Sequence, residues 1–463
     1  MTGLVEYPVV VMGSIDADFV RPLPDGLPPE VLATAMRTHQ KYFSCLNPDG
    51  TPAPRFLLIA NNDTPDGGKT IAAGNERVLR ARLADARFFW DQDRKVRLED
   101  RVEALKTRIY HEKLGSVYDK VERMETLAAY LADCVPGASQ ERSRRAAHLA
   151  KADLSTGMVG EFPELQGVMG RYYALSNDVE PPIANAVAEH YKPLGPHDAS
   201  PQAPDSITVA LADKIDALTG FFAAGERPTG SGDPYALRRA AQGVIRVILE
   251  NKLRLSLMDV FSQAAEALRL PMDRGLEVAT SLLSFINERL KVHLREAGIR
   301  HDLIAAAFEQ AGPMGIARRG NYEDDLIRLL AKVEALEGFL DTEDGANLLT
   351  AYRRASNIVS IEQRKDKRSY SGGVDASLLQ QHEELALNLI LDQADTIVQR
   401  GLREENFVGA MGTMADLRRP IDEFFERVTV NAQEKDLREN RLRLLARIRT
   451  TMDQVADFSK IEG

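Results

Sequence analysis

The chain has 463 residues, of which 28% are charged and 44% hydrophobic, and this composition indicates a folded protein of roughly three domains. Its net charge of −10 argues against a protein that coats nucleic acid through a broad basic surface, so a polyanion would have to meet local basic patches. No segment approaches the roughly 18 uninterrupted apolar residues of a membrane span, and no secretory signal is evident, so we expect a cytoplasmic protein with no membrane partner. Cys45 and Cys134 lie far apart and form neither a zinc knuckle nor a disulfide framework.

Residues 1–85 are predicted to form a small α/β piece. Two short branched apolar runs, LVEYPVVVM (4–12) and RFLLIA (55–60), have the pattern of buried strands. Between them, Pro29–Tyr42 has helical spacing, and the sequence NPDG at 47–50 predicts a turn. Two strands and one helix make a thin layer for an independent domain.

Helical periodicity dominates the rest, so the expected fold class is mainly α. We divide this part into a helical domain over 86–258, a helical linker over 259–320 that ends in the loop 312–320, and a C-terminal bundle over 321–463. In the first domain Leu98, Val102, Leu105 and Ile109 mark one apolar helical stripe. The bundle should hold five helices, over 322–336, 342–361, 378–401, 406–425 and 434–456.

A break in the helical pattern marks the stretch Arg144–Leu175. Gly157 and Gly160 interrupt an apolar run close to an acid, Asp153. Glycines allow backbone shapes that other residues resist, so the break either shapes a site around the acid or turns a corner between two core helices. The pattern alone favours the corner.

Four residues of the central helical region are candidates for a metal site: His111, Asp153, His190 and Asp213. Histidine and carboxylate ligands on separate helices are a normal way to bind a metal ion in a helical protein. The chain has eight histidines, and a buried histidine held by one hydrogen bond is the more common outcome. Spacing alone therefore leaves both interpretations open and favours packing.

Basic residues cluster in the C-terminal bundle although its overall charge is negative. Residues 320–463 contain 20 Lys and Arg against 27 Asp and Glu. The clusters are Arg353–Arg354, residues 364–368 (RKDKR), and the arginines between 438 and 449. Such residues either form a solvated helix face or contact RNA.

The chain closely resembles the β subunit of the bacterial-type, two-subunit glycyl-tRNA synthetase. The matching blocks run the length of the chain and include LVEYPVVVMGSID (4–16), LPPEVLATAMRTHQKYF (27–43), LAKADLSTGMVGEFPELQGVMGRYYA (149–174), RPTGSGDPYALRRAAQGVIRV (227–247), AYRRASNI (351–358) and DLRENRLRLLARI (436–448). Met1 stands directly before a stretch that is internal in this family, so the resemblance implies an N-terminally truncated piece.

The resemblance implies that the middle domain is HD-like. Metal-dependent HD phosphohydrolases use a His, a His-Asp pair and a distant Asp, which fall here at His111, at Ala152 and Asp153, and at Asp213, with His190 close by. Ala152 replaces a histidine ligand with a methyl group, and the loss of a ligand weakens a metal site severely. We therefore expect a degenerate HD scaffold with neither metal nor catalytic residues. An active HD phosphohydrolase acting on nucleotides or RNA ends is the alternative.

The resemblance also implies that the last domain is an anticodon-binding bundle of the arginyl type. On this view Arg353, Arg354 and Asn357 on one helix, and Arg438, Asn440 and Arg441 on another, contact tRNA. Glycine activation in the family belongs to the α subunit, so we expect ATP and Mg on that subunit and no cofactor here. The expected partners are glycine tRNA and the α subunit. A purely structural module, with solvated arginines, is a third interpretation.

Overall fold

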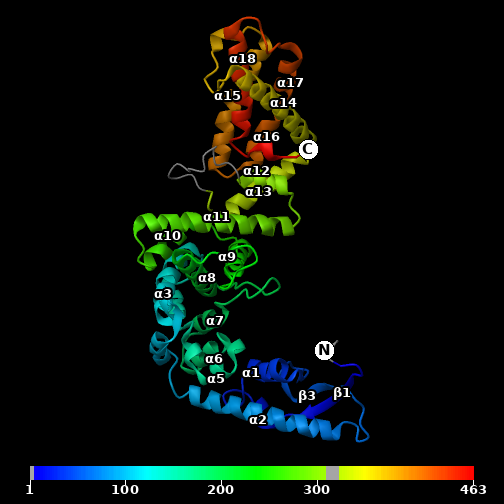
Figure 1. Cartoon of the computed structure of the whole chain (residues 1–463), viewed down its shortest axis with the longest axis vertical. Coiled ribbons are helices and arrows are strands. Elements are labelled where there is room, and N and C mark those ends of the chain that lie inside the picture. The colour runs from blue at the N-terminus through cyan, green and yellow to red at the C-terminus, as the bar shows by residue number, and fades with distance from the viewer. Residues whose placement is uncertain (1–4, 309–322, 463) are drawn as a thin grey trace. The chain divides into compact units, whose positions relative to one another are not determined.

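The computed structural model describes residues 5–308 and 323–462 and contains two compact units. Unit 1 comprises Met1–Leu253 and Met258–Ser284, and unit 2 comprises Arg254–Leu257 and Phe285–Gly463. The structure is 65% helical with small sheets, which confirms the predicted fold class (Figure 1). The predicted loop 312–320 lies outside the described residues, and the four-part division remains a prediction. None of the helices described is long and apolar enough to cross a membrane.

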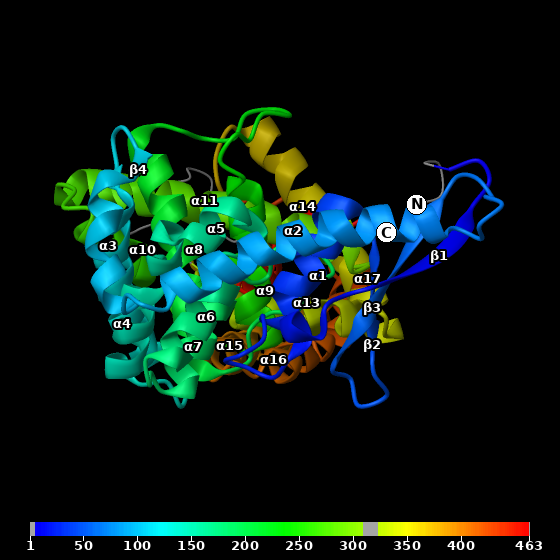
Figure 2. The ribbon, with the colours of Figure 1, turned by 90° about the horizontal axis from the view of Figure 1, so that it is seen from below.

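Unit 1 begins with a three-stranded antiparallel sheet in the order β1-β3-β2. The strands are β1 (Val9–Ser14), β2 (Phe43–Leu46) and β3 (Pro52–Ala60), and helices α1 (Pro29–Thr34) and α2 (Lys69–Asp93) pack beside them (Figure 2). The predicted turn at 47–50 joins β2 to β3 and closes with a hydrogen bond of 2.8 Å from the Asn47 amide to the Thr51 carbonyl. The helix predicted over Pro29–Tyr42 ends earlier, with α1 stopping at Thr34 and a π-helical turn over Ala35–His39. Strand β2 was missed because it is short and begins directly after the span predicted as helix.

The predicted α-helical stripe from Leu98 to Ile109 is wrong, because none of this span forms an α-helix. The chain forms two short 3₁₀ turns, Glu99–Arg101 and Glu103–Thr107, and then the hairpin β4 (Ile109–His111) and β5 (Gly115–Ser116). Leu98, Val102 and Leu105 are buried, whereas Ile109 is 80% exposed. The 3₁₀ turns have three residues per turn, so the 3.6-residue spacing ends before the strand begins.

The remaining helices of unit 1 are α3 (Val117–Cys134), α4 (Gln140–Leu149), α5 (Gly157–Glu161), α6 (Val168–Ser176), α7 (Pro181–Glu189), α8 (Pro204–Ala224), α9 (Leu237–Glu250) and α10 (Leu257–Ala267). Most residues of α8 are buried, and α3, α4, α7 and α9 pack against it. Helix α3 begins with a capping box in which the Ser116 and Asp119 side chains each bond the other residue's backbone amide. Helix α11 (Met272–Glu296) contributes residues to both units.

Unit 2 is a helical bundle around one apolar core. Its helices are α12 (His301–Phe308), α13 (Leu326–Leu340), α14 (Glu343–Asp366), α15 (His382–Arg403), α16 (Phe407–Ala415), α17 (Arg418–Arg427) and α18 (Lys435–Met452). The predicted helix over 406–425 is two helices, α16 and α17, separated at Asp416 and Leu417. Pro420 accounts for the break, because a proline ring clashes with the carbonyl four residues earlier.

Candidate functional site

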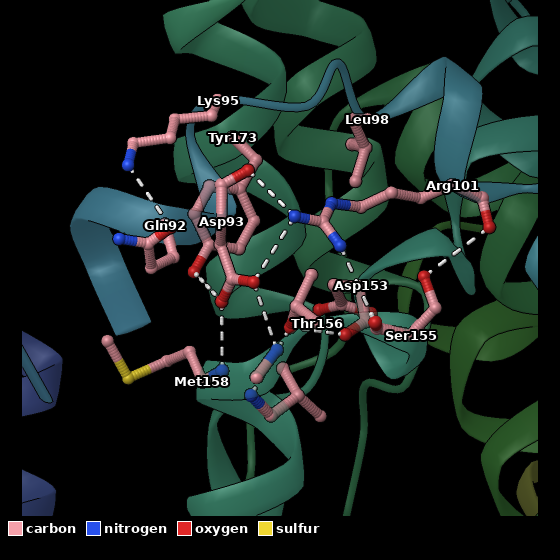
Figure 3. A network of polar contacts seen from close by, with 12 residues as sticks. Gln92, Asp93, Lys95, Leu98, Arg101, Asp153, Ser155, Thr156, Met158 and Tyr173 are labelled. Atoms are coloured by element: carbon pink, nitrogen blue, oxygen red, sulfur yellow. Dashed lines mark hydrogen bonds and ion pairs between the residues drawn. The ribbon is translucent and has the colours of Figure 1, made fainter. Parts of the chain in front are cut away.

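The glycine break in unit 1 is a packed corner built around Asp93, the last residue of α2. The Asp93 carboxylate accepts hydrogen bonds from the backbone amides of Gly157 and Met158 at 3.0 and 2.9 Å (Figure 3). It also receives the Tyr173 hydroxyl at 3.1 Å and pairs with Arg101 at 3.2 Å. Every one of these partners belongs to the protein itself, so the corner joins α2, α5 and α6.

Gly157 is required by packing at this corner. A Cβ placed there would lie 2.6 Å from the Phe89 ring, closer than carbon atoms approach one another. A Cβ on Gly160 would meet open space instead. Only the first of the two glycines therefore has a steric reason visible in the fold.

Asp153 follows α4 and is fully buried. One carboxylate oxygen accepts the backbone amides of Gly167 and Gly170, at 2.6 and 3.0 Å, and so anchors the start of α6. The other oxygen has no hydrogen-bond partner within the described part of the chain. Burial raises the pKa of Asp153 from 3.8 to about 6, against the effect of the two amides. Ala152 beside it is fully buried.

Asp213 lies on α8, and two buried lysines neutralise it. The ammonium groups of Lys120 and Lys151 lie 3.1 and 3.0 Å from its Oδ1. Burial acts to raise the pKa of Asp213, but the two ammonium groups outweigh it and hold that pKa well below 3.8. Lys120 also pairs with Asp216 at 3.0 Å, and Asp216 with Arg123 at 2.6 Å. We call these five residues the buried ion network.

The two histidines do not join Asp213 in a ligand set. His190 is fully buried, its Nδ1 lies 2.7 Å from the Val187 carbonyl, and burial followed by the charge of Lys151 lowers its pKa well below 6.5. His111 lies on β4, where its ring packs edge-on against Phe221 and Tyr235. Within the described ranges no three His, Cys, Asp or Glu side chains come together to hold a metal ion.

Lysine ammonium groups thus lie against the carboxylate that an HD-type metal site would use, and nothing among the residues that the structure describes supports the phosphohydrolase alternative. The sequence analysis missed Lys120, Lys151, Asp216 and Arg123. A signal was present for Lys120, which falls three residues after Val117 and four before Met124, beside the apolar stripe of α3.

In unit 2 the six predicted RNA-contacting residues divide by exposure. Arg441 is buried, and its Nε donates to the fully buried Glu384 at 2.6 Å while its Nη1 donates to the Thr429 carbonyl at 2.8 Å. Asn440 is also buried and brackets the backbone of Asp375, accepting its amide at 2.8 Å and donating to its carbonyl at 2.9 Å. These side chains face the protein interior.

Two further members of the set are also engaged internally. Arg438 pairs with Glu362 and, at 2.7 Å, with Asp366. Arg353 donates to the Ile461 carbonyl at 2.6 Å. Arg354 and Asn357, by contrast, are exposed on α14.

Continuing along α14, Ile361, Arg364 and Lys365 are exposed as well. With Arg354 and Asn357 they recur at helical spacing along one side of the helix. We call these five residues the α14 face. It combines three cationic side chains, one amide and one apolar side chain, a composition suited to phosphates and unpaired bases.

Comparison with known proteins finds two family models, one for each end of the chain. The family model described as glycyl-tRNA synthetase beta subunit matches residues 1–309. The model described as DALR anticodon binding domain matches residues 348–462, which contain α15 to α18 and all of α14 except its first turn. The C-terminal part is therefore a helical bundle similar to the DALR anticodon binding domain.

Three curated relatives cover the whole chain, and each is named glycine–tRNA ligase beta subunit. That of Rhodospirillum centenum is 53% identical over 466 residues, that of Phenylobacterium zucineum 48% over 471 and that of Cereibacter sphaeroides 49% over 469. The chain belongs to the glycyl-tRNA synthetase beta subunit family. It spans 63% of the length of the first relative and 65% of the other two.

Proposed function

We propose that this chain is the tRNA-binding, non-catalytic part of a two-subunit glycine–tRNA ligase in the cytoplasm. An α subunit would bind ATP, Mg and glycine and activate the amino acid, and this chain would bind glycine tRNA through unit 2. Family membership over the full chain supports the ligase assignment. The single observation that supports the RNA contact is the α14 face, which presents cations to solvent in an otherwise acidic bundle.

The six residues predicted to contact tRNA then take two different roles. Arg354 and Asn357 would contact RNA directly, together with Arg364 and Lys365. The other four hold the bundle together, because their donors are already bound to carboxylates or backbone carbonyls. The buried ion network of unit 1 would stabilise the scaffold and bind no substrate.

A titration of the full chain with tRNA tests this assignment. The chain should bind glycine tRNA more tightly than an unrelated tRNA, and aminoacylation should require both this chain and the α subunit. Arg364→Ala should weaken binding and lower the salt dependence by about one released counterion, since one phosphate contact is lost. Arg419→Ala is the matched control, because Arg419 is an exposed arginine that pairs with Glu423 on α17. Equal affinity for both tRNAs would contradict the proposal.

A further inference from the structure

One contact on the α14 face differs from the other arginine contacts of unit 2. The Arg354 guanidinium carbon lies 4.1 Å from the centre of the Phe425 ring, on the neighbouring helix α17 (Figure 1). Phe425 is half-buried and packs against the apolar core, so its ring is held in place. A guanidinium at this distance lies against the ring, and the exposure of Arg354 leaves its other side toward solvent.

Arg354 therefore presents a flat, supported surface. Arg438 and Arg441 direct their guanidinium groups at carboxylates. Arg354 forms no ion pair with any residue that the structure describes, and its guanidinium group packs on the Phe425 ring. Planar guanidinium groups and aromatic rings are the surfaces on which unpaired RNA bases stack.

The surrounding charges decide between a base and a phosphate. Glu426, next to Phe425 on α17, is exposed and forms no ion pair with any residue that the structure describes, whereas Asp422 pairs with Arg418 at 3.8 Å and Glu423 with Arg419 at 2.8 Å. The negative charge of Glu426 disfavours a phosphate beside Arg354, whereas a neutral base is not repelled. The cations at the other end of the α14 face, Arg364 and Lys365, are better placed for phosphates. Asn357, about one turn beyond Arg354, offers both a donor and an acceptor to a base edge.

We propose that Arg354 and Phe425 form a stacking platform for one unpaired base of the bound RNA, and that Asn357 hydrogen-bonds the edge of that base. This inference rests on the proposed function and adds the part of the RNA that the face recognises. In this arrangement Arg354 stacks on a base, whereas Arg364 and Lys365 contact phosphates.

The test uses the full chain and synthetic anticodon-arm stem-loops of glycine tRNA, each lacking the base at one loop position. For the wild type, removal of the stacked base should weaken binding by about 5- to 150-fold, while removal of most other bases should have smaller effects. Arg354→Lys keeps the positive charge but removes the planar guanidinium group, and Phe425→Leu keeps an apolar side chain but removes the aromatic ring. Both variants should bind the intact stem-loop more weakly and lose the penalty at that one position, with the salt dependence unchanged.

Arg419→Lys is the matched control, because Arg419 is an exposed arginine outside the α14 face, and it should leave the abasic profile as in the wild type. The platform is refuted if Arg354→Lys binds every stem-loop as the wild type does, or if no loop position shows an abasic penalty. A fall in salt dependence for Arg354→Ala without any change in the abasic profile would make Arg354 a phosphate contact and overturn the platform alone. A wild-type chain that does not prefer glycine tRNA overturns the proposed function itself. Far-UV circular dichroism confirms that each variant is folded.

Discussion

The variant Arg441→Ala tests whether Arg441 stabilises the fold or contacts RNA. Arg441 gives Glu384 its only ion pair within the described residues, and Glu384 is fully buried. The other Glu384 oxygen accepts the backbone amides of Gln380 and Gln381, at 2.9 and 2.8 Å, at the start of α15. Arg441→Ala therefore leaves a buried carboxylate held by two amides, and we expect unit 2 to lose stability.

Two estimates give the size of the stability loss in Arg441→Ala, one for an unpaired Glu384 carboxylate and one for a protonated Glu384. Breaking a buried ion pair by removing one partner costs about 3–5 kcal/mol. Glu384 can instead take up a proton, and from its ordinary pKa of 4.5 this costs about 3.4 kcal/mol at pH 7, or 1.36 kcal/mol per pH unit. Protonation therefore limits the charge penalty to about 3.4 kcal/mol, and with the lost bond to Thr429 we expect a total loss of about 4–5 kcal/mol at pH 7. At pH 5 the same reasoning leaves only about 1–2 kcal/mol.

The pH dependence follows from the direction of the pKa shift. Burial acts to raise the pKa of Glu384, but Arg441 and the two amides outweigh it and hold that pKa below 4.5. A lowered carboxyl pKa stabilises the fold above the pKa of the unfolded chain, and this stabilisation disappears as the pH falls through the folded-state pKa. The difference between wild type and Arg441→Ala should therefore be largest near neutral pH and shrink toward pH 5.

Urea unfolding followed by two signals measures this effect. The sole tryptophan, Trp90, lies in unit 1, so its fluorescence reports that unit while far-UV circular dichroism reports both. Arg441→Ala should shift only the transition that fluorescence does not see. Arg443→Ala is the matched control, because Arg443 pairs with Glu439 at the surface and should change stability by no more than about 1 kcal/mol. Adding Glu384→Gln to Arg441→Ala should recover part of the loss. Unchanged urea midpoints together with weakened tRNA binding would refute the structural role.

Three predictions concern unit 1, and urea unfolding followed by Trp90 fluorescence measures each. Burial raises the pKa of Asp153 to about 6, so the free energy of unfolding should fall by about 3 kcal/mol as the pH rises from 4 to 6. Asp153→Asn should abolish this pH dependence. Asp213→Asn should cost about 3–5 kcal/mol by leaving buried lysine charge unpaired, and adding Lys151→Met should recover part of it; no loss would contradict the ion network. Gly157→Ala should cost about 1–3 kcal/mol through the clash with Phe89, whereas Gly160→Ala should be neutral or slightly stabilising; equal effects would remove the steric explanation.

The helical part of the fold could be predicted because each helix in the bundle buries one stripe of side chains. The stripe on α14, for example, includes Leu348, Tyr352, Ala355 and Val359, which recur at helical spacing and are all buried. The 3₁₀ turns after Leu98 could not be separated from an α-helix in this way. They bury the same kinds of residue, and over two turns the two periods differ by little more than one position. The break at Pro420 was visible in the sequence and was overlooked within a long apolar pattern.

The candidate sites were harder to predict, because the roles of charged residues depend on partners distant in sequence. Arg441 stands on the buried stripe of α18, four residues after Leu437 and seven before Ile448. A charged residue at such a position predicts a buried pair, as Lys120 also shows on α3. Periodicity cannot name the partner, since Glu384 is 57 residues away along the chain. Arg354 lies off the buried stripe of its helix, so helical phase alone would have distinguished the exposed arginine from the buried one. What phase could not show is the Phe425 ring beneath it, which depends on how α17 packs against α14.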